Sequence, residues 1–188
     1  MKKTFLALAC ASLIPAVSAG FDQTEEVARA KQAVAGFSAA LKSELMAAMQ
    51  SGGALRAIEV CHTRAAEISE EVSLETGMSL FRVSQQNRSP SNVPNDWQTA
   101  VLQDFKSRIL AGEEAASLSW YAQAETADGP EFRFMKAIPT GGLCLQCHGT
   151  QIAPEVADKL SEIYPQDKAT GFKPGDLRGA FVVTSRVD

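Results

Sequence analysis

The sequence lacks a long apolar segment beyond its first nineteen residues, and it also lacks an excess of basic residues. No later segment approaches the apolar length needed to cross a bilayer, so we expect no membrane span in the rest of the chain. Lysine and arginine together number 18 against 22 acidic residues, which gives a formal net charge of −4. This acidity argues against nucleic acids and anionic membrane surfaces as partners.

The first nineteen residues, MKKTFLALACASLIPAVSA, have the pattern of a bacterial secretory signal. Two lysines open the stretch, an apolar run follows, and small residues at its end form a cleavage site. We therefore expect residues 1–19 to be a signal peptide that is cleaved after Ala19. Residues 20–188 would then form a single exported domain in the periplasm. Loss of the two lysines would leave 16 basic and 22 acidic residues, a net charge of −6.

Cleavage would also remove Cys10, which leaves an odd number of cysteines: Cys61, Cys144 and Cys147. In an oxidising compartment three thiols cannot all pair, so either one stays free or the cysteines serve another purpose. The chain contains only two histidines, and each follows a cysteine directly, in AIEVCHTRAAEI and in GGLCLQCHGT. Such an arrangement in so small a set indicates that the thiols and imidazoles are used together.

The run Cys144-Leu145-Gln146-Cys147-His148 fits the C-x-x-C-H attachment site of c-type haem. Two thiols at this spacing can reach the two vinyl groups on one edge of the porphyrin and form thioethers. The imidazole of the next residue then lies beneath the ring, where it can ligate the iron. The sequence therefore predicts one covalently attached haem c, with His148 as an axial ligand of its iron.

Other uses of this cysteine pair fit the sequence less well. A thioredoxin-like redox motif would begin a helix within a βαβ unit, and that surrounding pattern is missing. A disulfide between Cys144 and Cys147 would close a very short loop with poor geometry. The strongest rival is a structural zinc site, in which these two cysteines and Cys61 join one histidine in a tetrahedron. Zinc gives no reason for a histidine directly after the second cysteine.

Hydrophobic spacing and turn signals predict helices first and strands later in the chain. Two helices separated by Ser51-Gly52-Gly53 precede a strand, a proline-rich loop and a third helix capped by Asn95 or Asp96. The expected ranges are helices at 27–48, 55–76, 97–111 and 154–164, and strands at 78–86, 117–126, 132–140 and 179–187. This order predicts an α+β fold in which an antiparallel sheet carries the N-terminal helices on one side.

The residues alone leave the second axial ligand of the iron open. Cys61 lies roughly 45° and His62 roughly 55° from the centre of the apolar face of the second helix, so both can face inward. The remaining candidates are the methionines Met46, Met49, Met78 and Met135. Cys61, His62 and a methionine therefore stay as alternatives at this point.

The sequence resembles the Tll0287-like haem domain family. The resemblance rests on AIEVCHTRAAEI, FRVSQQNRSPSNVPNDW, RFMKAIPTGGLCLQCHG and YPQDKATGFKPGDLRGAFVVT, which occur in the family's order and span most of the chain after residue 19. It implies a PAS-like fold that carries covalent haem c, with histidine on one side of the iron and cysteine on the other. On this chain those ligands correspond to His148 and Cys61. The chain departs from the family at Ser89, where the loop more often reads Arg-Asn-Pro.

A His/Cys pair has functional consequences. A thiolate donates negative charge to the iron and favours Fe(III), so the reduction potential would lie below that of a His/Met site. Six-coordinate iron leaves no open position, so we expect no enzymatic activity, although a diatomic gas could replace a ligand that dissociates. We therefore expect redox or gas sensing, or low-potential electron transfer, with a separate signalling protein or redox partner. The alternatives are a haem enzyme with peroxidase-like activity and a zinc-structured binding module.

The carboxylates of a haem need cationic or hydrogen-bonding partners. Four basic residues in or near the family-like stretches are available for this purpose: Arg82, Arg88, Lys136 and Arg178. The sequence does not distinguish them from ordinary surface or packing residues.

Overall fold

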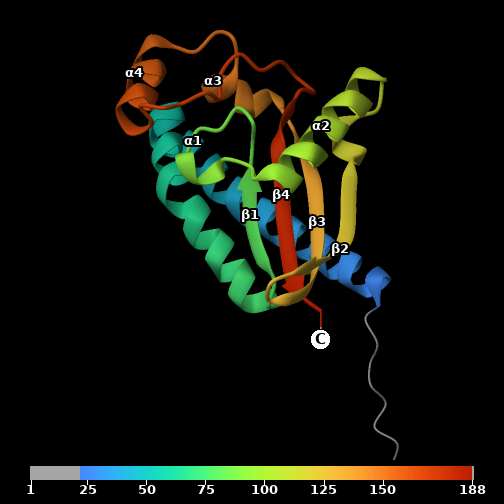
Figure 1. The fold of residues 1–188 in the computed structure, drawn as a ribbon. Helices are drawn as coiled ribbons and strands as arrows, with labels where there is room; N and C mark the ends of the chain where they lie inside the picture. The colour runs from blue at the N-terminus through green and yellow to red at the C-terminus, as the bar shows by residue number, and fades with distance from the viewer. Residues whose placement is uncertain (1–21, 188) are drawn as a thin grey trace, which may run out of the picture.

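The computed structural model of the protein describes residues 22–187, so the expected signal peptide lies outside the described residues. Its elements, shown in Figure 1, are α1 (Gln23–Thr76), β1 (Ser79–Val83), η1 (Pro90–Asn92), α2 (Asp96–Leu110), η2 (Ala115–Ser117), β2 (Ser119–Thr126), β3 (Gly129–Pro139), η3 (Gly142–Cys144), α3 (Leu145–His148), α4 (Pro154–Ile163) and β4 (Leu177–Arg186). Within residues 22–187, none of the helices is long and apolar enough to span a membrane.

Helix α1 is bent into two arms at the predicted break. Gly52 and Gly53 have non-helical dihedral angles, and the φ of Gly53 is 65°, a left-handed value that favours glycine. The first arm (residues 23–51) and the second arm (residues 54–76) therefore form a helical hairpin, which Figure 1 shows beside the sheet. The second arm ends at Gly77, whose left-handed backbone closes the helix as predicted.

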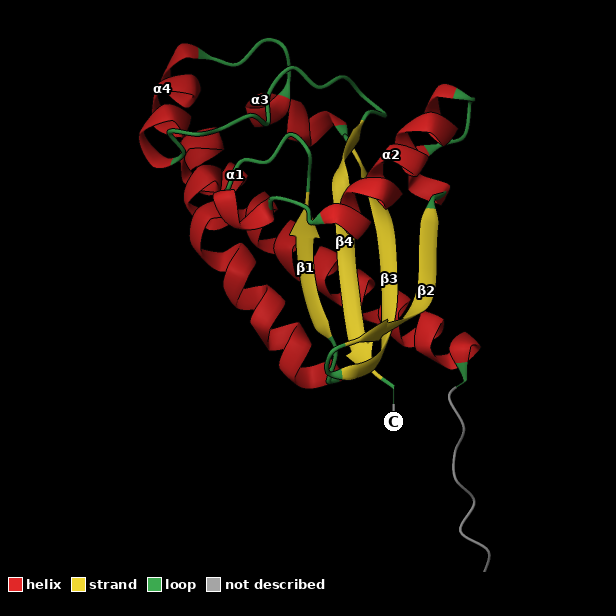
Figure 2. Ribbon diagram, in the orientation of Figure 1, coloured by secondary structure: helices red, strands yellow, loops and turns green. Residues whose placement is uncertain are grey.

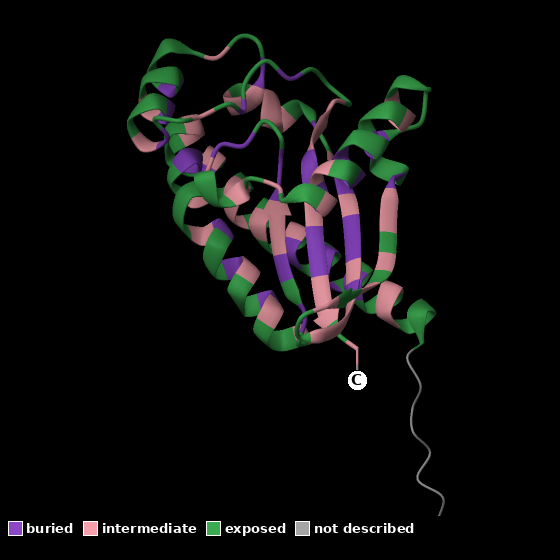
Figure 3. Cartoon of the chain, viewed as in Figure 1, coloured by how far each residue is buried: buried purple, intermediate pink, exposed green. Residues whose placement is uncertain are grey.

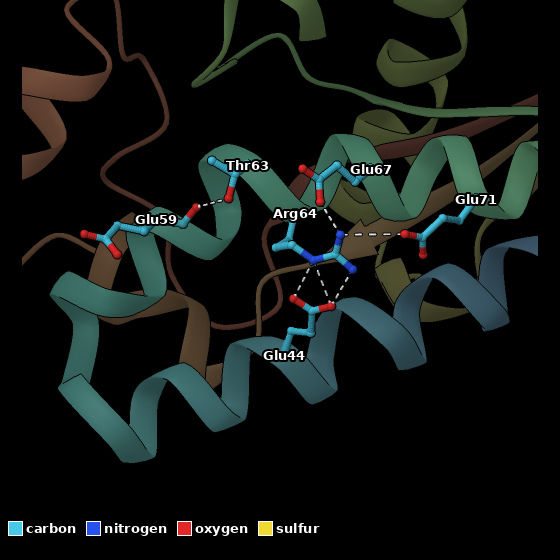
Figure 4. Close-up of polar contacts among 6 residues, drawn as sticks. All are labelled: Glu44, Glu59, Thr63, Arg64, Glu67 and Glu71. Carbon is cyan, nitrogen blue, oxygen red and sulfur yellow. Dashed lines mark hydrogen bonds and ion pairs between the residues drawn. The ribbon is translucent and has the colours of Figure 1, made fainter.

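Arg64, which follows Cys61 by one helical turn, connects the two arms of this hairpin. Its Nε and Nη2 donate to the carboxylate of Glu44 in the first arm at 3.0 and 2.8 Å. The same guanidinium also contacts Glu67 and Glu71 of its own arm, as Figure 4 shows. The arginine of the AIEVCHTRAAEI motif is therefore a cross-link that holds the second arm against the first.

We expect Glu44→Gln to reduce stability near neutral pH and to have little effect in acid. The Arg64 guanidinium holds the pKa of the Glu44 carboxyl below its ordinary value of 4.5. A carboxyl with a depressed pKa in the folded state stabilises above its unfolded pKa, and the stabilisation is lost as pH falls through the lowered value. Urea unfolding near neutral pH and below about pH 4 measures this difference. Glu70→Gln, on an exposed residue of the second arm, serves as the control; equal losses at both pH values would contradict the prediction.

The four strands form one antiparallel sheet in the order β1-β4-β3-β2. The hairpin expected at Asp128-Gly129-Pro130 is present, and Gly129 at its turn has a φ of 105°. The first strand is shorter than predicted and ends at Val83, since Ser84 is hydrogen-bonded to Asn92 of the following loop instead. Within the sheet, the buried residues are concentrated in the two central strands, as Figure 3 shows.

Helices cover both faces of the sheet. Val183 packs with Phe37 of α1, whereas Val182 packs with Phe105 of α2. Successive residues of a strand point to opposite faces, so α2 lies on the face that α1 leaves open, as Figure 2 shows. The predicted α+β class is confirmed, and the expectation of helices on one side holds for α1 alone. The sequence of α2 shows which residues are apolar, but not which face of the sheet they cover.

A third apolar cluster lies beside the bend of α1, at the start of its second arm. It joins Ile58 of the second arm to Val156, Leu160 and Tyr164 in and just after α4, with Cys147 packed against it. Helix α4 begins at Pro154 and ends before Pro165, as predicted. This cluster forms the base of a lobe in which the two Cys/His segments of the chain meet.

Candidate cofactor site

The C-x-x-C-H run occupies a tight turn that follows strand β3. Cys144 ends η3, and Cys147 and His148 lie on α3, a helix of a single turn. Gly149 must follow His148, because a Cβ atom there would lie 2.5 Å from the carbonyl oxygen of Leu145. Cys61, Cys144 and Cys147 are all unpaired and half-buried. The two thiols of the run are therefore available for covalent attachment to a ligand.

The imidazole of His148 is held by the segment between α4 and β4. Its Nδ1 lies 2.7 Å from the carbonyl oxygen of Ala169, and its backbone carbonyl accepts from the N–H of Phe172 at 2.9 Å. The Phe172 ring stands edge-on to the imidazole, with 6.3 Å between the ring centroids. A carbonyl oxygen can only accept, so Nδ1 carries the proton of this hydrogen bond. In a neutral ring, Nε2 is then the atom with the free lone pair.

Charge and burial keep that ring neutral. Burial, followed by the positive charges of Arg178 and Arg88, lowers the pKa of His148 to about 3, although the Ala169 hydrogen bond opposes the shift. The folded protein therefore presents an oriented, unprotonated Nε2 at physiological pH. This is the form of histidine that binds metals, with its other nitrogen hydrogen-bonded to a backbone carbonyl.

Arg88, from the loop after β1, connects the C-x-x-C-H turn to the segment after α4. Its Nε donates to the carboxylate of Asp167 at 3.0 Å, and its Nη2 donates to the carbonyl oxygens of Cys147 and Ala169 at 2.5 and 3.3 Å. The Asp167 carboxylate also accepts from the N–H of Ala169 at 2.7 Å. Arg88 is 8% exposed, so this ion pair is shielded from water. One guanidinium thus fixes both the second cysteine of the motif and the carbonyl that orients His148.

The structure separates the two residues that the helical wheel left equivalent. Cys61 is half-buried, and burial raises the pKa of its thiol, while the positive charges of nearby Arg82, Arg88 and Arg178 lower it. His62 is exposed, and its ring stands edge-on to Tyr164 with 5.3 Å between the ring centroids.

The other candidate ligands are placed differently. Met78 and Met135 are buried in the two clusters on either face of the sheet, apart from the lobe that holds Cys147. Met46 is exposed on the first arm of α1. Within residues 22–187, no group of three or more Cys, His, Asp or Glu side chains is arranged to hold a metal ion. The cysteines and histidines therefore do not form the compact tetrahedron that a structural zinc site requires.

Sequence reasoning did not single out Asp167, Tyr164 or the Ala169 carbonyl. All three lie in the stretch YPQDKATGF, which contributed to the family resemblance without any assigned role. A hydrogen bond to a backbone carbonyl leaves no signal in residue type, and Asp167 lies 79 residues from its partner Arg88. Only the family-like stretch as a whole could have drawn attention to them.

Comparisons with known proteins identify a family and a shared fold. The model of the Tll0287-like family matches residues 16–186. A crystal structure of the cyanobacterial haem protein Tll0287 aligns with a TM-score of 0.65 and 20% sequence identity, over 87% of this chain and 96% of that one. At this identity the alignment shows that the fold is shared. Among curated proteins, no significant match was found.

Proposed function

The chain belongs to the Tll0287-like family, and from this premise we propose that it is an exported c-type haem protein with histidine and cysteine as axial ligands. Cys144 and Cys147 would form the two thioethers, and His148 and Cys61 would bind the iron from opposite sides. The related structure is described as a haem protein, which supports the choice of cofactor. The neutral, hydrogen-bonded imidazole of His148 also supports that cofactor.

The observation that carries the proposal is the hydrogen bond from His148 Nδ1 to the Ala169 carbonyl at 2.7 Å. It orients the imidazole and leaves Nε2 free to bind iron. Arg88 and Asp167 hold that carbonyl and the backbone of Cys147 in one rigid unit. The motif that would attach the haem and the group that would orient its histidine are therefore positioned together.

Cys61 is proposed as the second ligand because the family resemblance implies it, and because its half-buried thiol has the same arginine neighbours as His148. Burial favours its neutral thiol, whereas Arg82, the first of its positive neighbours, favours the thiolate. Arg82, Arg88 and Arg178 also act electrostatically on His148. Both residues thus border one region, from the second arm of α1 and from α3.

A bound haem supplies one-electron redox chemistry and an iron that small ligands can reach if an axial bond opens. We propose that the protein uses it in redox or gas sensing, or as a low-potential electron carrier in the periplasm. In either role it would act on a separate signalling protein or redox partner. A peroxidase-like enzyme would require an open iron position, which two protein ligands would close.

The first test is to look for covalently bound haem in the protein purified after expression of the full sequence. We expect a haem stain to remain with the polypeptide after denaturing electrophoresis, and a pyridine haemochrome spectrum of the c type. Metal analysis provides the competing outcome, because a colourless protein that contains zinc would refute the proposal in favour of the binding module. A redox titration followed optically, with and without carbon monoxide or nitric oxide, then separates carrier from gas sensor. Gas binding at low concentration favours the sensor.

A further inference from the structure

We propose that Arg82 and Arg178 bind the two propionate carboxylates of the haem, an inference that deepens the function proposed above and rests on it. Of the four basic residues that the sequence offered for this role, the structure favours these two. The argument depends on where their guanidinium groups lie and on which anions surround them.

The two arginines come from neighbouring strands at the same end of the sheet. Arg82 is the penultimate residue of β1, and Arg178 is the second residue of β4. These strands are antiparallel and paired, with Val83 opposite Ala180 in the register. The end of one strand therefore lies beside the beginning of the other, next to the lobe that contains Cys61 and His148. Both arginines act electrostatically on both of these residues.

Neither guanidinium has a carboxylate partner in the described part of the chain. Arg82 lies over the ring of Phe37, 5.3 Å from its centroid, and no hydrogen bond or ion pair reaches it within residues 22–187. Arg178 donates to the Ser84 hydroxyl and the Gln86 carbonyl, each at 3.2 Å, and lies over the Phe172 ring. Both cations are therefore half-buried without a compensating anion, an arrangement that costs stability.

The pKa values of the two guanidinium groups are lowered, as expected for cations without a neighbouring anion. Burial, followed by the positive charges of Arg88 and Arg82, lowers the pKa of Arg178 to about 10. Burial also lowers the pKa of Arg82 below its ordinary value, against the opposing effects of Cys61 and Tyr164. Bound carboxylates would remove this penalty. Two guanidinium groups without anions match the two carboxylates of a haem in number, and the planar fork of arginine suits a carboxylate.

The other two basic residues already have partners. Arg88 is paired with Asp167 at 3.0 Å and donates to two backbone carbonyls. Lys136 donates to the carbonyl oxygen of Ala116, at the end of the sheet near η2. Arg88 therefore holds the C-x-x-C-H turn against the segment after α4, and Lys136 is hydrogen-bonded to a backbone carbonyl. Neither is free to bind a propionate.

Esterified haem tests the inference directly. The full chain with Cys144→Ser and Cys147→Ser serves as a host that binds haem without covalent attachment. Soret titrations with hemin and with hemin dimethyl ester measure how strongly the host prefers free carboxylates. We expect a preference on the order of tenfold or more, because hydrogen bonds to charged groups are the strong ones. Adding Arg82→Gln and Arg178→Gln should bring the ratio of the two affinities close to one. Esterification and these substitutions remove the same interaction, so in a double-mutant cycle their effects should not add.

Arg133→Gln in the same host is the matched control. Its guanidinium pairs with Glu131 and lies over the Trp97 ring, so the preference for free carboxylates should persist. A preference that is unchanged after Arg82→Gln and Arg178→Gln would overturn the inference.

The covalent holoprotein gives a second readout if the host binds neither ligand. The propionate-bending band in its resonance Raman spectrum should shift in Arg82→Gln and in Arg178→Gln, and should stay in place in Arg133→Gln. A band that does not move in the first two variants would refute the propionate assignment while leaving the haem itself established. Absence of covalent haem from the unmodified chain would instead refute the proposed function.

Discussion

Replacing Cys61 with alanine is expected to change the optical spectrum from that of a low-spin His/thiolate haem and to raise the reduction potential by about 100 mV or more. Axial ligands set haem potentials over a range of about 0.8 V, and loss of an anionic thiolate removes a strong stabiliser of Fe(III). The side chain is half-buried and the charge of Arg82 acts on its thiol, so its loss would act on the proposed haem site rather than on the surface. Optical and paramagnetic resonance spectra of the oxidised protein, with a redox titration, measure both effects.

His62→Ala is the matched control for this experiment. It changes the adjacent residue on the same arm of α1, but the His62 side chain is exposed and contacts the ring of Tyr164. We expect its spectrum and potential to remain close to those of the unmodified protein. If His62→Ala alters the low-spin bands and Cys61→Ala does not, the assignment of the cysteine as ligand is wrong.

Replacing Arg88 with alanine is expected to lower the free energy of unfolding by about 3–5 kcal/mol, the usual cost of removing one partner from a buried ion pair. The side chains of Arg88 and Asp167 are 9% and 12% exposed, so the change leaves a shielded carboxylate without its counter-ion. The carbonyl oxygens of Cys147 and Ala169 also lose a donor. Urea unfolding followed by circular dichroism measures the loss, and haem content reports whether the C-x-x-C-H turn remains in place.

Arg108→Ala provides the comparison for Arg88→Ala. Arg108 is likewise paired with a carboxylate, that of Glu113 at 2.7 Å, but both side chains are substantially exposed. Exposed ion pairs contribute little to stability, so its loss should be much smaller than that of Arg88. Asp167→Asn tests the same buried pair from the other side and should also be destabilising. Similar small losses in Arg88→Ala and Arg108→Ala would show that Arg88 does not hold the site together.

Several features of the fold could be predicted because their causes are local. Gly52 and Gly53 break α1 where predicted, since glycine alone tolerates the left-handed backbone found at Gly53. Helix α4 begins at Pro154 and ends before Pro165 because proline is tolerated at the first turn of a helix and ends the preceding one. Asn95 caps α2 through a hydrogen bond to the N–H of Gln98. Each of these depends on residues within one or two turns of each other.

The position of α2 could not be predicted in the same way. Its apolar residues show that it packs against something, but the face of the sheet on which it lies depends on how α1 covers the other face. The same limit applied to Cys61 and His62. They are adjacent on one helix and nearly equivalent on a helical wheel, and only packing against α4 and the arginine-bearing strands distinguishes them.

The sequence by itself therefore determined the α+β class, the breaks between helices and the C-x-x-C-H spacing, because dihedral limits and covalent reach act over a few residues. The tertiary structure decided that Cys61 is half-buried and His62 exposed, that Arg88 holds the site, and that the Ala169 carbonyl orients His148. Those contacts join residues 21 to 81 positions apart in the chain. Their partners include backbone atoms that every residue carries, so residue type alone does not reveal them.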